Sequence, residues 1–286
     1  MPEQPDHSEQ SEQQVWFVTG SSRGLGRAVA EEVLAAGHKV AATARGTDTL
    51  AGLTEKYGDA VLPLALDVTD AARAGQAVQE AVDHFGRIDV VVNNAGYANM
   101  APVEDMALDD FRAQVEAVFF GTVHVTKAAL PFFRAQHSGH FIQVTSHGGR
   151  TTAPGLGAYQ AAKFAVEGFS GVLHQEVAPL GIKVTLIEPG GIRTDWAGSS
   201  MRTPPLRPEY EPTVGALVKR VRETSGKESI DPAKIGRVLL EITKLDEPPL
   251  HLPMGGYTVD TIREAMRTLM EEDARWAETG RSVDFD

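Results

Sequence analysis

The feature that most constrains the fold is an unbroken alternation of short apolar runs and helical patterns between Val15 and Pro189. The apolar runs have the length of strands. The run within residues 88–96 is almost continuously hydrophobic, as in a strand buried on both faces. This alternation predicts an α/β fold, a Rossmann-type doubly wound parallel sheet of about seven strands flanked by helices.

The same pattern places most of the elements. Strands are expected within residues 15–20, 39–44, 61–68, 88–96, 140–146 and 182–191. Helices are expected within residues 24–37, 75–86, 107–133 and 158–178, the first of them ending at Gly37.

Residues 14–286 contain no linker, and we expect them to form a single domain. Residues 1–13 are polar and acidic, so a disordered tail is expected there. Proline and turn residues predict a substrate lid at about 195–225, although plain surface loops share this composition. A C-terminal helical extension follows. Its apolar stripe indicates core packing or a subunit contact, and consists of Val259, Ile262, Met266, Leu269 and Met270.

Composition excludes several classes of function. The formal net charge is −12, which argues against nucleic-acid binding, because that role requires a basic face. The chain has no cysteine, so disulfides, thiolate metal sites and a cysteine nucleophile are excluded, and no metal site is expected. Residues 1–13 lack the apolar core of a signal peptide, and no apolar window is long enough to span a membrane. We therefore expect a cytoplasmic protein.

The stretch "TGSSRGLG", Thr19–Gly26, allows two interpretations. Gly20, Ser22 and Gly24 match the nucleophile elbow of a hydrolase, whereas Gly20, Gly24 and Gly26 match a turn that holds a dinucleotide phosphate. An elbow normally follows several strands and an oxyanion-hole loop, and here a single expected strand precedes the turn. The strand before it and the helix after it favour the dinucleotide turn, with helix N–H groups facing the phosphates.

Four further features follow in order along the chain. They are the run Asn93–Gly96, Ser146, the pair Tyr159 and Lys163 in "YQAAK", and the run "PGGIRT" at Pro189–Thr194. With the glycine turn, this series resembles the classical short-chain dehydrogenase/reductase family over roughly residues 15–194. The resemblance implies an NAD(P)-dependent oxidoreductase that acts on an alcohol or carbonyl group.

The candidate catalytic residues are Ser146, Tyr159 and Lys163. Tyr159 and Lys163 are four residues apart on a helix and share a face, so the ammonium should lower the pKa of the phenol. An isolated pair of this kind is also common on protein surfaces. The resemblance implies that Tyr159 exchanges the proton with the substrate oxygen, that Ser146 hydrogen-bonds this oxygen, and that Lys163 holds the nicotinamide ribose.

The resemblance also implies a set of cofactor-binding residues. Asp67 would contact the adenine, although a helix N-cap is the alternative. Ile192 and Thr194 would hold the carboxamide, although an ordinary turn is the alternative. The full set is Gly20, Ser22, Arg23, Gly24, Leu25, Gly26, Arg45, Asp67, Val68, Asn94, Ala95, Gly96, Tyr159, Lys163, Pro189, Gly190, Ile192 and Thr194.

The end of the second strand indicates which nicotinamide is used. Members of this family that prefer NAD usually carry an acidic residue there, whereas this chain has Ala44 followed by Arg45. Arg23 in the glycine turn adds a second guanidinium, and arginine matches phosphate geometry. We therefore predict NADP(H), against the alternative of two surface arginines.

One position departs from the family. An asparagine that helps to hold a water beside the lysine is replaced by Val118, which puts the proton relay in question. A backbone carbonyl could hold the water instead, or His147 could handle protons, although His147 could equally only line the substrate pocket. Trp196, Met100 and Met201 indicate an apolar pocket.

These observations predict an oxidoreductase for a small, hydrophobic carbonyl or alcohol. The alternative is a non-catalytic dinucleotide-binding or sensing protein of the same fold. Expected partners are the small-molecule substrate and copies of the chain itself, in a homodimer or homotetramer built through the two long helices, without nucleic acid or membrane.

Overall fold

The computed structural model describes residues 13–196, 198 and 201–285, so most of the expected tail at 1–13 lies outside the described residues. Seven strands form one parallel sheet in the order β3–β2–β1–β4–β5–β6–β7, which confirms the predicted architecture. The strands are β1 Val15–Val18, β2 Lys39–Ala44, β3 Val61–Ala65, β4 Val90–Asn93, β5 Gly139–Val144, β6 Ile182–Pro189 and β7 His251–Met254.

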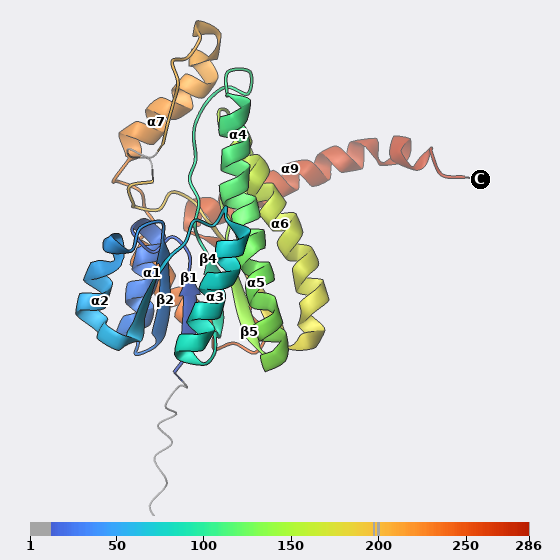
Figure 1. The fold of residues 1–286 in the computed structure, drawn as a ribbon. Helices are drawn as coiled ribbons and strands as arrows, with labels where there is room; N and C mark the ends of the chain where they lie inside the picture. Colours follow the sequence, from blue (N-terminus) through green and yellow to red (C-terminus); the bar gives the residue numbers. More distant parts are fainter. Residues whose placement is uncertain (1–12, 197, 199–200, 286) are drawn as a thin grey trace, which may run out of the picture.

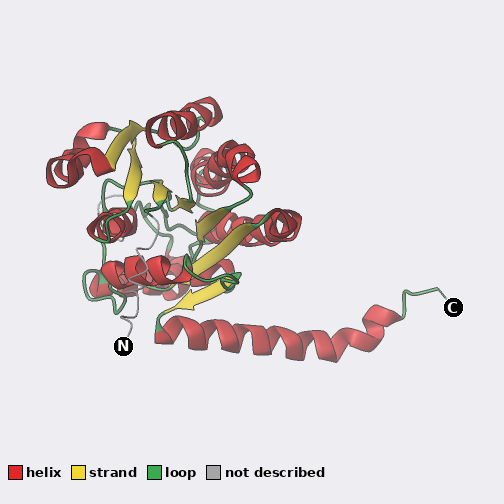
Figure 2. Cartoon of the chain, turned by 90° about the horizontal axis from the view of Figure 1, so that it is seen from below, coloured by secondary structure: helices red, strands yellow, loops and turns green. Residues whose placement is uncertain are grey.

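Helices cover both faces of the sheet and enclose one apolar core on each (Figures 1 and 2). One core contains side chains of α1 (Gly24–Ala35), α2 (Ala51–Tyr57) and α8 (Pro232–Ile242). The other contains side chains of α3 (Ala71–Phe85), α5 (Gly121–Gln136) and α6 (Gly157–Val177). The remaining helices are α4 Leu108–Val115, α7 Ala216–Thr224 and α9 Gly256–Arg281.

The strand order reverses between β1 and β4, because the chain winds outward from β1 to β3 and then returns to the other side of β1. The loops that leave neighbouring strands diverge at such a switch point. Doubly wound sheets bind their ligands at such a switch point, here beyond the carboxyl ends of β1 and β4.

Local sequence explains where several helices begin and end. The Asp70 side chain accepts a hydrogen bond from the Arg73 backbone N–H at 2.9 Å and caps α3. Gly86 then ends α3 in the left-handed region, at φ 84°. Gly37 follows α1 at φ 88°, which confirms it as the predicted stop.

Three regions differ from the sequence prediction. The single helix expected at 107–133 is interrupted by a π-helical turn at Glu116–Phe120, between α4 and α5. The predicted lid contains α7. β7, at the edge of the sheet, was not placed from the sequence, and its proline is typical of an edge strand.

The C-terminal helix α9 packs on the body only through its first turns. Thr258 and Ile262 are buried, whereas Leu269 and Met270 are exposed. Figures 1 and 2 show α9 leaving the body in both views. Core packing therefore explains only the beginning of the predicted stripe. No helix among the described residues is both long enough and apolar enough to cross a membrane.

Candidate active site

The glycine turn lies between β1 and α1 and depends on its glycines. Gly20 and Gly24 have φ values of 70° and 60°, a region that side chains disfavour. A Cβ on Gly26 would lie 2.4 Å from the Gly20 carbonyl oxygen, so no larger residue fits there. The turn therefore brings its backbone close to α1, as a phosphate-binding turn requires.

Hydrogen bonds from β4 hold this turn in place. Thr19 Oγ1 accepts from the backbone N–H groups of Asn94 (2.8 Å) and Ala95 (3.0 Å), and Asn94 Nδ2 donates to the Thr19 carbonyl at 2.8 Å. Asn93 instead points into the sheet, where its Nδ2 donates to Thr126 and Gln143. Asn93 therefore braces the sheet, and the Asn94 side chain braces the turn.

The N-terminus of α1 fits an anionic group. Its N-cap residue, Arg23, makes no side-chain capping bond, and the first turn of the helix carries no acidic residue. The helix dipole and the free N–H groups are thus left for a ligand phosphate. The neighbouring Leu25 is buried in the core and anchors the helix, while Ser22 lies partly exposed in the turn.

The three catalytic candidates meet at the carboxyl edge of the sheet. Ser146 follows β5, is buried, and accepts a hydrogen bond from the Gly148 backbone N–H at 3.0 Å, which orients its hydroxyl. Tyr159 and Lys163 are buried on α6, and Lys163 Nζ lies 5.7 Å from the centre of the Tyr159 ring. Lys163 Nζ also donates to the Val144 carbonyl at 2.7 Å, which fixes it beside the end of β5.

Burial dominates the proton affinities in this group. It raises the pKa of Tyr159 above its ordinary value, and the hydrogen bond with Ser146 opposes this shift. The lowering that the sequence predicted from Lys163 is not found. One physical reason is that burial lowers the pKa of Lys163 itself to about 8. The charged form of Lys163 is therefore less favoured over the neutral amine than it is in water.

The loop Pro189–Thr194 after β6 closes the site against the glycine turn. The Pro189 carbonyl accepts from Ser146 Oγ at 3.4 Å, and a Cβ on Gly190 would lie 2.4 Å from Thr258 Oγ1. Ile192 packs against the core and pairs with Ile230 in an isolated β-bridge. A Cβ on Gly24 would lie 3.7 Å from Thr194 Cβ, which brings this loop next to the turn.

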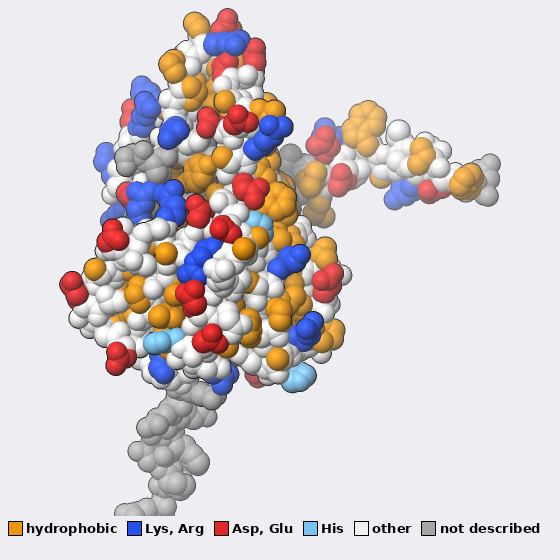
Figure 3. All heavy atoms as spheres, viewed as in Figure 1, with side chains coloured by type: hydrophobic (Ala, Val, Ile, Leu, Met, Phe, Trp, Pro, Cys, Tyr) orange, Lys and Arg blue, Asp and Glu red, His pale blue; other side chains and the backbone are white. Residues whose placement is uncertain are grey.

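The two candidate phosphate-binding arginines differ in their surroundings. Arg23 forms an ion pair with Asp195 at 2.5 Å, and the two side chains are 50% and 52% exposed. Arg45 follows β2, is exposed, and lies near enough to Tyr97 to influence its pKa. Residues 201–224, which include α7, are called the α7 lobe below. Figure 3 shows Lys and Arg side chains gathered on this face, where the α7 lobe meets the body.

Asp67 lies beyond the end of β3 and is exposed. Its Oδ1 accepts from the backbone N–H and the hydroxyl of Thr69, at 3.0 and 2.8 Å. It does not cap α3, because Asp70 does. The adjacent Val68 is buried against Gly121, where any Cβ would come within 2.6 Å of Val68 Cγ2.

Val118 lies in the π-helical turn and is buried. Its carbonyl accepts from Thr122 Oγ1 at 3.0 Å, and its Cγ2 would lie 3.4 Å from a Cβ on Gly96. π-helical turns are frequent at functional sites.

Two side chains border the space in front of Tyr159. The ring of Trp196 meets that of Tyr159 edge-on, with 5.8 Å between the centroids. His147 lies within 3.5 Å of Ser146 Oγ, and burial lowers its pKa, so it is neutral at physiological pH. Met100 belongs instead to the apolar cluster that joins the α7 lobe to the body.

A buried ionic cluster behind the catalytic residues was missed from the sequence. Glu167, one turn after Lys163, accepts from Thr145 Oγ1 at 2.5 Å, and Glu188 accepts from Arg150 at 3.0 Å. His251 Nδ1 lies 2.8 Å from Glu188 and 3.4 Å from Glu167. Burial, with the charge of Glu188, raises the pKa of Glu167 to about 7.

This cluster ties the ends of β5 and β6 to α6 and to the start of β7. Its members come from separate parts of the chain, so no local sequence motif predicts it. The one sequence signal was two charged residues inside otherwise apolar patterns, Glu167 and Glu188. Charged residues are rarely buried without partners.

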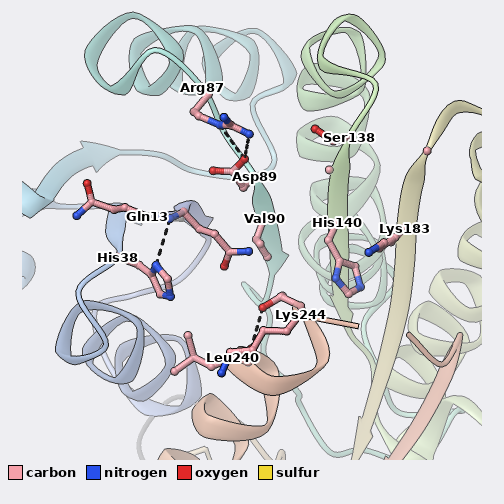
Figure 4. A pocket seen from close by; sticks show the side chains of 14 residues that line it. Gln13, His38, Arg87, Asp89, Val90, Ser138, His140, Lys183, Leu240 and Lys244 are labelled. Carbon is pink, nitrogen blue, oxygen red and sulfur yellow. Dashed lines mark hydrogen bonds and ion pairs between the residues drawn. The ribbon is translucent and has the colours of Figure 1, made fainter. Parts of the chain in front are cut away.

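A separate pocket of about 480 Å³ opens at the other end of the sheet (Figure 4). Lys183 already donates to the Leu245 carbonyl, Lys244 pairs with Glu241, and Arg87 pairs with Asp89. This pocket lies at the amino ends of the strands, away from the switch point and from Tyr159. It has no part in the site described above.

Comparison with known proteins agrees with this geometry. The family model described as "short chain dehydrogenase" matches residues 14–204. The chain belongs to the short-chain dehydrogenases. This short-chain dehydrogenase is 54% identical to the oxidoreductase BOA17 of Botryotinia fuckeliana, over 92% of this chain and 97% of the relative.

Solved structures agree as well. A short-chain dehydrogenase from Streptomyces avermitilis matches with a TM-score of 0.90 and 35% identity, covering 96% of this chain and 100% of that one. Another, from Burkholderia cenocepacia in complex with NADP, matches with a TM-score of 0.72 and 25% identity, covering 92% and 97%. The short-chain dehydrogenase described here is therefore an oxidoreductase.

Proposed function

We propose that this oxidoreductase uses NADP(H) to interconvert a carbonyl and an alcohol on a small, hydrophobic substrate, with Tyr159 as general acid and base. The proposal includes the cytoplasmic location and the homo-oligomeric state expected from the sequence. The single observation that carries it is the meeting of Ser146, Tyr159 and Lys163 at the carboxyl edge of the sheet.

The residues at the switch point fit a nicotinamide dinucleotide. The glycine turn admits no side chain at Gly26, and the first turn of α1 offers free N–H groups without a competing carboxylate. When bound, this cofactor supplies or accepts the hydride. The chain's contribution is to hold it and to move the proton.

The proton step follows from the positions of three side chains. Because the pKa of Tyr159 is raised, its phenol is protonated at neutral pH and can donate to a carbonyl oxygen. Ser146 Oγ, held by the Gly148 backbone N–H, turns its proton from the distant Pro189 carbonyl to the same oxygen when substrate is bound. Lys163, buried and held by Val144, supplies positive charge beside the phenolate that forms when the proton leaves.

Preference for NADP(H) rests on charge. No carboxylate follows β2, where Ala44 is buried and the exposed Arg45 comes next. Arg23 contributes a second guanidinium near the turn. The NADP in the Burkholderia cenocepacia relative is consistent with this assignment. Trp196, edge-on to Tyr159, supports an apolar substrate.

Substitution of Tyr159 tests the reaction. Tyr159→Phe keeps the ring and removes the proton, so turnover with NADPH and a panel of carbonyls should fall at least about 10²-fold. NADPH should still bind, as followed by its fluorescence. Tyr257→Phe, on an exposed tyrosine, is the matched control and should retain activity. Full turnover by Tyr159→Phe would assign the acid elsewhere, with His147→Ala as the next variant to test.

Cofactor preference is tested at Arg45. A charged hydrogen bond contributes ~1.5–3 kcal/mol, so Arg45→Ala should weaken NADPH binding about 10- to 150-fold and leave NADH binding unchanged. Isothermal titration of both cofactors measures this. Arg134→Ala, at an exposed arginine of α5, is the control. Equal affinity of the unmodified protein for NADPH and NADH would contradict the assignment without affecting the catalytic proposal.

A further inference from the structure

Helix α9 is amphipathic, although Asp273 interrupts its apolar face, and only its base, residues 256–266, packs on the body among the described residues. Val259, Ile262, Met266, Met270 and Ala274 recur at spacings of three and four residues and share one face. From Arg267 to Arg281, every residue of the helix except Ala277 is exposed. The apolar face therefore continues beyond the part of the helix that the body covers.

The exposed part of α9 carries large apolar side chains. Leu269 and Trp276 continue the edge of the apolar face one and two heptads after Ile262. Met270 is 71% exposed and Trp276 is 64% exposed. Figure 3 shows hydrophobic side chains along this arm.

The exposed part of α9 has little packing within one chain. Most of the stability of helices in proteins comes from packing of an apolar face rather than from the helix's own hydrogen bonds. The ion pairs of Arg267 with Glu264 and Glu271 lie at the surface, where solvent screens them. The arm needs a surface that covers Met270 and Trp276.

The base of α9 offers such a surface. A groove runs between α9 and the body, lined on the helix side by Val259, Ile262, Met266 and Met270, and on the body side by Arg150 and Pro253. Arg263, Arg267 and Glu271 also line it. The groove thus combines an apolar floor with edges that carry three arginines and one glutamate, although Arg150 pairs with Glu188 and Arg267 pairs with Glu271.

Charge along α9 is complementary to this groove. Between Thr268 and Arg281 the helix carries four carboxylates, Glu271, Glu272, Asp273 and Glu278, against two arginines. A contact between two identical chains about a two-fold axis is reciprocal, so the arm of each lies over the base of the other. An antiparallel pair of α9 helices would place the acidic arm of one chain beside the basic groove of the other.

We propose that α9 is an exchanged arm, and that its exposed half packs in antiparallel orientation into the α9 groove of a second copy of this chain. This interface is separate from the two long helices that the sequence analysis considered. It requires neither cofactor nor substrate, so it stands apart from the proposed reaction, and it specifies one interface of the homo-oligomer that the proposed function includes.

The test is sedimentation velocity of the full chain at micromolar concentration, with two matched double variants. Met270→Glu with Trp276→Glu adds two carboxylates to the apolar face, and Thr268→Glu with Thr279→Glu adds two to the polar face. The unmodified protein and the polar-face variant should have the same mass. The apolar-face variant should have half of it.

Two further measurements separate loss of contact from loss of folding. Deletion of residues 267–286 should halve the mass while circular dichroism shows an unchanged melting transition of the body. Trp276→Ala should raise the dissociation constant about 30-fold, as expected of an interface hot spot. In hydrogen exchange, the amides of residues 269–281 should be protected in the unmodified protein and lose protection in the apolar-face variant.

Three results would each overturn the proposal. The first is a monomeric mass for the unmodified protein at tens of micromolar. The second is an unchanged mass in both the apolar-face variant and the deletion. The third is a mass that halves only with Val172→Glu, at an exposed position of α6, because the interface would then lie on the long helices.

Discussion

At the scale of single residues, Glu167 has a role distinct from that of the catalytic side chains beside it. It lies one turn after Lys163 on α6 and joins Thr145, the residue before Ser146, to the Glu188–His251 pair. Its carboxyl group is buried beside a second carboxylate, so its pKa is raised to about 7. Its proton is therefore held in the folded protein at a pH where a free glutamate would have lost it.

This raised pKa predicts a pH dependence of stability. Between about pH 4.5 and 7 the folded chain retains a proton that the unfolded chain releases, so the free energy of unfolding falls as pH rises through this window. Glu167→Gln cannot ionise and keeps an acceptor for Thr145. It should match the unmodified protein at pH 5 and exceed it by on the order of 1–3 kcal/mol at pH 8.

Urea unfolding at the two pH values measures this difference. Glu80→Gln, at an exposed carboxylate of α3, is the control and should follow the unmodified protein at both. An equal pH dependence in Glu167→Gln and the unmodified protein would show that the carboxyl group ionises normally in the fold.

Sequence reasoning identified Ser146, Tyr159 and Lys163 because they stand at fixed spacings along one strand and one helix. It missed Arg150, Glu167, Glu188 and His251, which come together only through the order of β5, β6 and β7. It also gave the wrong direction for the pKa of Tyr159. A helical spacing shows that two side chains share a face, but it does not show how far burial removes both from water.

At the scale of elements, the π-helical turn between α4 and α5 is the main departure from regular structure near the site. It positions Val118 against Gly96, and the Val118 carbonyl accepts from Thr122 Oγ1. Apolar periodicity predicted a helix through this region because one additional residue in a turn barely alters the pattern. β7 escaped prediction because it is four residues long and contains a proline.

Replacement of Val118 tests whether proton supply limits the reaction. Val118→Asn should raise turnover about 2- to 10-fold, a small part of the ~10²–10⁴-fold that positioned proton transfer contributes. It should also reduce the dependence of the rate on buffer concentration. A buried amide without partners costs ~1–3 kcal/mol, so the melting temperature should fall.

Steady-state rates across a buffer series, followed beside thermal melts, measure both effects. Val82→Asn on α3, a partly buried valine on another helix, controls for the chemistry of the substitution. A folded Val118→Asn variant with unchanged rate and buffer dependence would assign the relay to the backbone carbonyl or to His147.

At the scale of the whole molecule, Arg23 and Asp195 join the glycine turn of the body to the start of the proposed lid. Both side chains are about half exposed, so their ion pair contributes ~0–1 kcal/mol. Asp195→Asn releases Arg23 and should tighten NADPH binding up to about fivefold, while NADH binding stays unchanged. Titration calorimetry with both cofactors checks this difference.

Asp109→Asn removes an exposed ion pair with Arg112 on α4 and is the matched control. If Asp195→Asn tightened NADPH and NADH binding equally, the substitution would act through opening of the proposed lid. Arg23 would then make no contact with the 2′-phosphate. Weaker NADPH binding would mean that Asp195 supports the site in another way.

The hydrogen bonds between Thr19 and the Asn94–Ala95 backbone also bear on how the chain acquires its site. They join positions about 75 residues apart, and the Arg23–Asp195 pair spans 172. We expect contacts of such sequence separation to form late in folding, because the entropy cost of closing a long loop must be met before the contact contributes free energy. We therefore expect a chain still being synthesised to form helices and a partial sheet before these contacts. We also expect its ability to bind a cofactor to appear only when the sheet is complete.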